Sequence, residues 1–128
     1  MTDPLQRLAT WLEEERLAVN PFPQGAVLAT RGADGRPHAR MMRVALDEEL
    51  MPFILTSRGS RKADDIAACA DASIAWAFQA SLRSVSLEGR LEPMSDALLE
   101  ARWAAMEPAM QARQSLCGAR SGQWLDDA

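Results

Sequence analysis

The segment Ser60-Arg61-Lys62 stands where a helical pattern begins and carries residue types that bind anions. A hydroxyl, a guanidinium fork and an ammonium group can together hold phosphate oxygens, and a helix start adds partial positive charge. Lys62 is the only lysine of the chain. The competing interpretation is a solvated turn in which Ser60 only caps the helix, and from spacing alone capping is the more common case. The glycine spacing of a Walker A loop is absent.

His38, Arg40 and Arg43, which precede this segment in the sequence, could also contribute chemistry. Arg40 and Arg43 lie three apart in a strand pattern, so their side chains are expected on opposite faces, with Arg43 at a solvated rim. His38 is the only histidine, and a lone histidine at a strand start is expected at the surface. No catalytic triad is apparent, and one histidine with two distant cysteines does not form a zinc site. The sequence therefore indicates neither a catalytic residue nor a metal ligand.

The composition predicts one globular domain spanning residues 1–128, since 48% of the side chains are hydrophobic. A formal net charge of −4 does not favour a general nucleic-acid or membrane binder. Cys69 and Cys117 are far apart and are expected to be reduced thiols of a cytoplasmic protein. No charged leader opens the chain, and no apolar run is long enough to span a bilayer.

Local patterns predict the elements that position these residues. Asp3-Pro4 is a typical helix start, and apolar residues recur at helical spacing as far as Leu17. An Asp34-Gly35 turn between two strand patterns predicts a β-hairpin. Strands are predicted over 26–30, 40–44, 51–56, 73–79 and 84–92, and further helices over 61–70 and 96–106. Five strands with few helices indicate an α+β fold that is mainly β, a small antiparallel barrel with flanking helices.

Burial can be predicted for some of these elements. Ile66 and Ala67 are expected to face inward from their helix. The strand over 73–79 is apolar at both parities, which predicts burial on both faces. Its aromatic residues Trp76 and Phe78, and Trp103 of the last helix, are expected to pack in the core. Gly89 interrupts the last strand pattern and predicts a bulge or a close backbone approach.

The order of these motifs resembles the pyridoxamine 5'-phosphate oxidase family, the FMN-binding split β-barrels. The resemblance covers most of the chain and is carried by four segments: Asp34–Pro37 with Ala39–Met42, Phe53–Thr56, Ser60–Lys62, and Ser84–Arg90. The stretch from Arg102 to Arg113, with Gly122 and Leu125–Asp127, is similar to the oxidase-related FMN-binding subgroup typified by cyanobacterial Alr-type members.

The resemblance implies an FMN at a homodimer interface. It implies that Arg40 and the Ser60–Lys62 segment hold the cofactor phosphate. Ser84 stands where family members place a polar residue, often glutamine, near the cofactor, although serine is shorter. The full cofactor-binding set that the resemblance implies is Arg40, Met41, Met42, Arg43, Leu55, Thr56, Ser60, Arg61, Lys62 and Ser84.

Departures from the family pattern bear on the substrate. The oxidases carry a lysine at the position of Ala45, and a tyrosine, an arginine and a serine that grip the substrate phosphate at the positions of Trp103, Glu107 and Gln111. Glutamate in place of arginine would repel a phosphate, so pyridoxamine 5'-phosphate is not the expected substrate. Family members also continue beyond the position of Ala128, which implies a short or truncated form that lacks the family's C-terminal part.

The resulting expectation is an FMN-dependent oxidoreductase that acts on an unknown small molecule. A flavin carrier or sensor without turnover remains open, as does a cofactor-free dimeric domain. The sequence does not separate FMN from a related deazaflavin. Nucleic-acid binding is not expected, because no basic patch with interleaved aromatic residues is visible.

Overall fold

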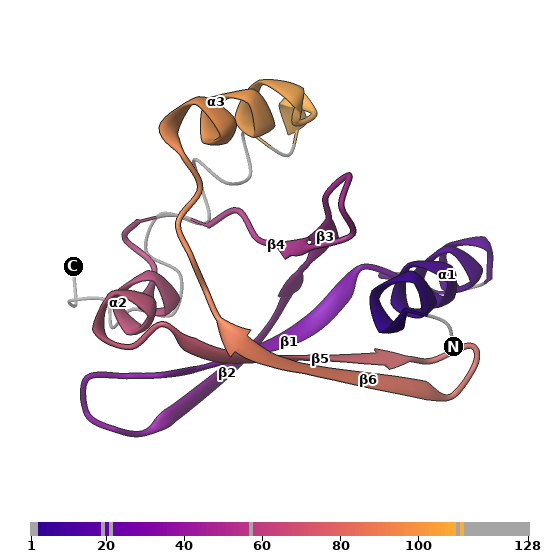
Figure 1. Cartoon of the computed structure of the whole chain (residues 1–128), viewed down its shortest axis with the longest axis horizontal. Coiled ribbons are helices and arrows are strands. Elements are labelled where there is room, and N and C mark those ends of the chain that lie inside the picture. Colours follow the sequence, from indigo (N-terminus) through magenta and orange to yellow (C-terminus); the bar gives the residue numbers. More distant parts are fainter. Residues whose placement is uncertain (1–2, 19, 21, 57, 110, 112–128) are drawn as a thin grey trace. The chain divides into compact units, whose positions relative to one another are not determined.

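The computed structural model describes residues 3–18, 20, 22–56, 58–109 and 111. Within these residues the chain forms three helices and six strands (Figure 1). They are α1 (Pro4–Leu17), β1 (Gly25–Arg31), β2 (Pro37–Arg43), β3 (Ala45–Leu46), β4 (Pro52–Phe53), α2 (Arg61–Ala68), β5 (Asp71–Phe78), β6 (Arg83–Arg90) and α3 (Asp96–Ala105). The expectations for Cys117, Gly122 and Leu125–Asp127 lie outside the described residues.

Four strands form one sheet in the order β2-β1-β5-β6, and β3 pairs with β4 in a second, two-stranded antiparallel sheet. The predicted hairpin joins β1 to β2, and Gly35 takes the left-handed conformation at its turn with φ of 78°. Its N–H group donates to the Gly32 carbonyl oxygen at 2.9 Å. In the described residues the larger sheet ends at β2 and β6, so a mixed α and β fold with antiparallel hairpins is observed, and no closed barrel.

The described chain divides into two compact units. The first unit comprises 1–29, 39–55 and 72–89, and the second comprises 30–38, 56–71 and 90–128. All buried hydrophobic side chains among the described residues belong to the first unit: Leu8, Ala26, Leu28, Val44, Ile74, Trp76 and Phe78. Each large apolar side chain that is fully buried stabilises the fold by about 1.5–3 kcal/mol.

Helix α1 is fastened within the first unit by a buried carboxylate. Its start agrees with the prediction, since the Asp3 side chain accepts a hydrogen bond from the Leu5 N–H group at 2.9 Å. Glu15 is 1% exposed, and its Oε1 atom accepts from the Ala80 N–H group at 2.6 Å and from Asn20 Nδ2 at 2.9 Å. This carboxylate therefore links α1 to the turn between β5 and β6.

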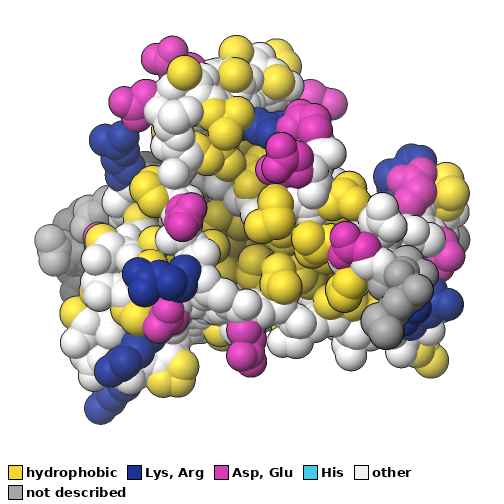
Figure 2. Space-filling view, viewed as in Figure 1, with side chains coloured by type: hydrophobic (Ala, Val, Ile, Leu, Met, Phe, Trp, Pro, Cys, Tyr) yellow, Lys and Arg dark blue, Asp and Glu magenta, His cyan; other side chains and the backbone are white. Residues whose placement is uncertain are grey.

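The second unit has a polar interior. Its buried residues with polar side chains are Thr30, Ser60 and Asp65. Helix α3 begins at Ser95, whose Oγ accepts from the Leu98 N–H group at 3.2 Å, as a serine cap should. None of the described residues of α3 is buried, and the expectation that Trp103 packs in the core is wrong, since it is 43% exposed. Figure 2 shows apolar side chains at the surface of this helix. None of the described helices has the length and apolar character needed to cross a membrane.

Several sequence-based expectations about local structure are wrong. The predicted strand over 51–56 is reduced to β4. Before β4, the Asp47 side chain folds the chain into a turn by accepting from the N–H groups of Glu49 and Met51. Strand β5 is buried on one face instead of two, since its small Ala75 and Ala77 are exposed.

Two further corrections concern single residues. Ile66 is half-buried and Ala67 is exposed, so the buried residue of α2 is the polar Asp65. A Cβ atom added at Gly89 would meet nothing within 4 Å, so no close backbone approach explains this glycine. Nothing in its described surroundings requires a residue without a side chain.

Candidate functional site

The start of α2 is built by Ser60, which is its N-cap residue. The Ser60 Oγ accepts a hydrogen bond from the Ala63 N–H group at 3.3 Å and lies 3.2 Å from the Thr56 hydroxyl. Ser60 is fully buried, whereas Arg61 and Lys62 are half-buried. The capping role predicted for Ser60 is therefore confirmed, and its position fixes the first turn that carries the two cations.

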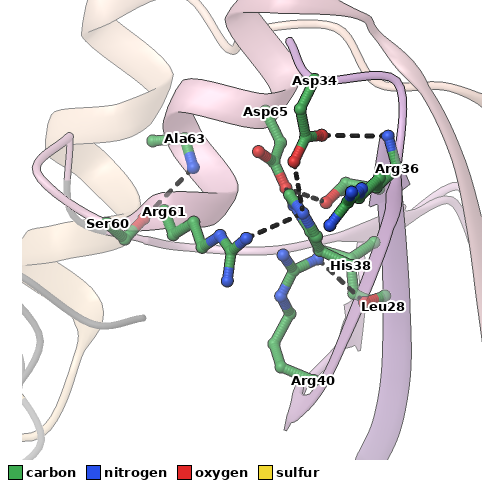
Figure 3. A network of polar contacts seen from close by, with 10 residues as sticks. Leu28, Asp34, Arg36, His38, Arg40, Ser60, Arg61, Ala63 and Asp65 are labelled. Carbon is green, nitrogen blue, oxygen red and sulfur yellow. Dashed lines mark hydrogen bonds and ion pairs between the residues drawn. The ribbon is translucent and has the colours of Figure 1, made fainter. Parts of the chain in front are cut away.

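A network of polar contacts joins α2 to the β1–β2 hairpin (Figure 3). Asp65 is its centre: the carboxylate Oδ2 accepts from the Thr30 hydroxyl at 2.8 Å and lies 2.7 Å from His38 Nδ1. Asp65 is 4% exposed, and the His38 side chain is 14% exposed. A buried carboxylate needs such donors because it has lost its water.

The opposite edge of the same imidazole contacts Arg61. The Arg61 Nη2 atom lies 2.8 Å from His38 Nε2. A guanidinium group can only donate, so Nε2 must be the acceptor and carries no proton in this arrangement. The proton of the neutral ring then lies on Nδ1, where Asp65 accepts it. The contacts run from Arg61 through His38 to Asp65, with Thr30 donating from the other side.

The hairpin turn closes around the ring. A Cβ atom at Gly32 would lie 2.6 Å from His38 Cε1, so a residue with a side chain would displace the imidazole. Asp34 Oδ1 accepts from the Arg36 N–H group at 2.9 Å, and Asp34 Oδ2 lies 3.6 Å from His38 Nε2. The hydrogen bond from the Arg36 backbone N–H group lowers the pKa of Asp34, and the positive charges of His38 when it is protonated, of Arg36 and of Arg61 contribute to the lowering.

The expectation that His38 is a surface residue is therefore wrong. Two sequence signals could have revealed it. Arg61 and Asp65 are spaced four apart in α2 and so share one helix face. His38 has the same parity as the apolar Met42 in β2, and these two side chains therefore lie on the same face of the strand. Neither signal shows that the strand and the helix meet, because the partners are 27 and 23 residues apart.

The other predicted site residues lie in the first unit. Arg40 is half-buried and its Nη1 donates to the Leu28 carbonyl oxygen at 3.0 Å (Figure 3). Arg43 is exposed and its Nε donates to Gln24 Oε1 at 2.6 Å, so the predicted opposite orientation of the two arginines is confirmed. Met42 and Leu55 are half-buried, and Met41 and Ser84 are exposed.

The predicted cofactor residues are thus divided between the two units. The first unit holds Arg40, Met41, Met42, Arg43, Leu55 and Ser84, and the second holds Thr56, Ser60, Arg61 and Lys62. In the second unit, the cap, the cations and the Thr56 hydroxyl come together at one helix start. That these ten residues contact a cofactor stays a prediction.

Residues 12–124 match the family described as pyridoxamine 5'-phosphate oxidase. The chain belongs to this family. It is 32% identical over 126 residues to the pyridoxine/pyridoxamine 5'-phosphate oxidase of Cupriavidus pinatubonensis, over 98% of this chain and 55% of that protein. The chain spans about half the length of the curated oxidases that it matches.

Two solved structures show the fold of the family. PhzG from Burkholderia lata 383, in complex with tetrahydrophenazine-1-carboxylic acid, superposes with a TM-score of 0.84 at 21% identity, over 98% of this chain and 62% of that chain. A pyridoxamine 5'-phosphate oxidase-related, FMN binding protein from Nostoc punctiforme PCC 73102 gives a TM-score of 0.77 at 22% identity, over 98% and 70%. At these identities the likeness concerns the fold alone.

The positions at which the sequence departs from the oxidase pattern are also described. Ala45 is half-buried in β3. Helix α3 ends at Ala105, so Glu107 and Gln111 follow a break in the helix. The Gln111 side chain turns back and its Nε2 donates to the Trp103 carbonyl oxygen at 2.7 Å. None of the four side chains at these positions is a cation that could bind a substrate phosphate: Ala45, Trp103, Glu107 and Gln111.

Proposed function

We propose that the chain is an FMN-binding flavoprotein and acts as an FMN-dependent oxidoreductase on a small molecule other than pyridoxamine 5'-phosphate. The observation that carries this proposal is the start of α2, where a buried serine cap fixes the turn bearing Arg61 and Lys62. Family membership supports the flavin as the anion that this turn receives.

The residues at the start of α2 fit a phosphate group. Arg61 would donate two N–H groups to phosphate oxygens, and Lys62 would add a point charge. The positive end of α2 favours a dianion in the same place. The donor set, with a guanidinium, an ammonium and hydroxyl groups, is the chemistry that a phosphate requires. Ser60 acts by holding the turn, because its oxygen already caps the helix.

The rest of the proposal follows the family pattern. Arg40, Met41, Met42, Arg43, Leu55, Thr56 and Ser84 are proposed contacts of the cofactor, in a split β-barrel that forms a homodimer around it. Bound FMN supplies the hydride chemistry, and the chain supplies binding, orientation and electrostatics. The substrate is proposed to lack the phosphate of pyridoxamine 5'-phosphate, because Glu107 replaces the arginine that would grip it and Ala45 replaces a lysine that contacts the substrate.

The absorbance spectrum and mass of whatever copurifies with the chain give the first test. Titration with FMN should then show binding, and Arg61→Ala combined with Lys62→Ala should abolish it while the protein remains folded. Arg7→Ala combined with Arg90→Ala is a matched control, because it removes two exposed cations elsewhere and should leave binding unchanged. A colourless protein that takes up no FMN would overturn the proposal.

Turnover needs a separate measurement, because the departures at Ala45 and Glu107 also suit a flavin carrier. The loaded protein is mixed with a reduced nicotinamide under anaerobic conditions, and air is then admitted. Steady reduction followed by reoxidation supports the oxidoreductase. A flavin that stays bound and is reduced by no donor supports the carrier. Gel filtration with and without FMN tests the homodimer.

A further inference from the structure

We propose that His38 is a positioning residue for Arg61, and that its neutral ring holds the guanidinium in place for the phosphate of the cofactor. This inference rests on the proposed FMN binding. It concerns only the second unit, where both residues lie. His38 was not part of the predicted cofactor-binding set, and its proposed role is exerted through Arg61, without contact to the cofactor.

The geometry restrains the imidazole on three sides. Asp65 fixes the Nδ1 edge at 2.7 Å, and the Gly32 backbone lies against Cε1 so closely that no Cβ atom would fit. Arg61 occupies the Nε2 edge at 2.8 Å. The Thr30 hydroxyl in turn fixes Asp65 at 2.8 Å, so the acceptor that orients the ring is itself held.

The protonation state of the ring decides whether it can hold Arg61. The charged and titratable groups that face His38 are Asp65 and Arg61 from α2, and Asp34 from the hairpin turn. A proton on Nε2 would set two donors against each other at 2.8 Å, and if Nδ1 kept its proton as well it would also set two positive charges against each other. With a proton on Nε2, the ring would have Asp34 Oδ2, at 3.6 Å, as its nearby acceptor in place of a contact to Arg61. The positioning role therefore belongs to the neutral ring.

Positioning of this kind strengthens binding, because the Arg61 side chain then loses less conformational entropy when the phosphate binds. A free arginine side chain loses considerable rotamer freedom when it is immobilised on a phosphate. Arg61 has already lost part of that freedom to His38. A guanidinium has five N–H donors, so one bond to the imidazole is compatible with a two-pronged contact to phosphate oxygens.

The test compares FMN with riboflavin, which lacks the phosphate. His38→Phe keeps a planar ring and removes both nitrogen atoms, and it should weaken FMN binding by about tenfold while leaving riboflavin binding unchanged. His38→Gln offers one donor and one acceptor, and it should recover part of the loss. In an Arg61→Ala background, His38→Phe should add no further loss, because a residue that acts through Arg61 has nothing left to position.

Two results would overturn the inference while leaving the proposed function intact. One is an equal loss of FMN and riboflavin binding in His38→Phe, which would indicate general damage to the site. The other is the same fold-loss with and without Arg61. Thermal unfolding of each variant shows whether the fold is retained. If the wild-type chain binds no FMN at all, the proposed function fails first.

A proton–nitrogen NMR spectrum of the imidazole gives a readout that needs no cofactor. His38 is the only histidine, so a chain freed of any histidine tag shows one ring. We expect the neutral ring to be the Nδ1–H tautomer, and we expect Asp65→Asn to lose that preference. His38→Phe should also shift the Arg61 Nε signal, whereas an Nε2–H tautomer in the wild type would overturn the inference.

Discussion

The Thr30 hydroxyl donates a hydrogen bond to the Asp65 carboxylate at 2.8 Å, and both residues are buried. The two residues are 35 positions apart and join the end of β1 to the middle of α2. Because the second unit has no fully buried hydrophobic side chain among its described residues, bonds of this kind hold its elements together.

Thr30→Val keeps the shape of the side chain and removes the donor. Asp65 then loses a hydrogen bond inside the protein, so we expect the free energy of unfolding to fall by about 1–3 kcal/mol in chemical denaturation. Thr10→Val is the matched control, since the Thr10 hydroxyl donates to the Gln6 carbonyl oxygen on the exposed face of α1. Its effect should stay within about 0.5 kcal/mol. Equal losses at the two positions would contradict the prediction.

Two glycines give a pair of opposite expectations. Gly32→Ala places a methyl group 2.6 Å from the His38 ring, and we expect a loss of about 1–3 kcal/mol in stability as the ring is displaced. Gly89→Ala meets nothing within 4 Å and restricts only the unfolded chain, so it should be neutral or stabilise by up to about 1 kcal/mol. Thermal unfolding distinguishes the two, and destabilisation by Gly89→Ala would contradict the second expectation.

The turn between β5 and β6 contains a strained residue. Leu82 has φ of 58°, a left-handed conformation that costs a residue with a side chain about 1–2 kcal/mol, and it is 91% exposed. Leu82→Gly should therefore raise the free energy of unfolding by about 0.5–1 kcal/mol, after the flexibility of glycine is counted. Leu82→Ala is the control, because it shortens the side chain and keeps the strain. A stabilisation by alanine of equal size would point to removal of an exposed apolar group instead.

The depressed pKa of Asp34 predicts a dependence of stability on acid. The folded-state pKa lies below the unfolded value because the Arg36 N–H group binds the carboxylate. The contribution is therefore fully present above the unfolded pKa and is lost as the pH falls through the folded pKa. Unfolding of the wild type and of Asp34→Asn should differ at neutral pH and converge in acid. A difference that grows on acidification would contradict this assignment.

Local patterns predicted most of the helices and hairpins because the interactions that fix them join residues close together in the sequence. Asp3, Ser60 and Ser95 cap their helices as predicted, and each bond spans only two or three residues. Trp76 and Phe78 share a buried face because alternation along a strand requires it. The family was also predicted from the order of motifs, and it is confirmed by the match over residues 12–124.

The candidate site was harder to predict, because its contacts join residues that are far apart in the sequence. The pattern of α2 indicated apolar residues on the inner face, and the residue found there is Asp65, whose partners come from a distant hairpin. The role of His38 depends on the same meeting of strand and helix. The start of strand 51–56 was predicted one residue too early for a different reason: the Asp47 side chain accepts from the N–H group of Met51, just before the strand.

The buried Glu15 carboxylate makes α1 part of the cooperative structure of the first unit. Ala80 is an exposed turn residue, yet its N–H group is bound to Glu15 at 2.6 Å. Its amide hydrogen should exchange with solvent only when α1 detaches, and therefore as slowly as amides in the middle of the helix. Glu15→Ala should make this one amide exchange rapidly, whereas Glu14→Ala, which removes an exposed partner of Arg83, should leave it protected.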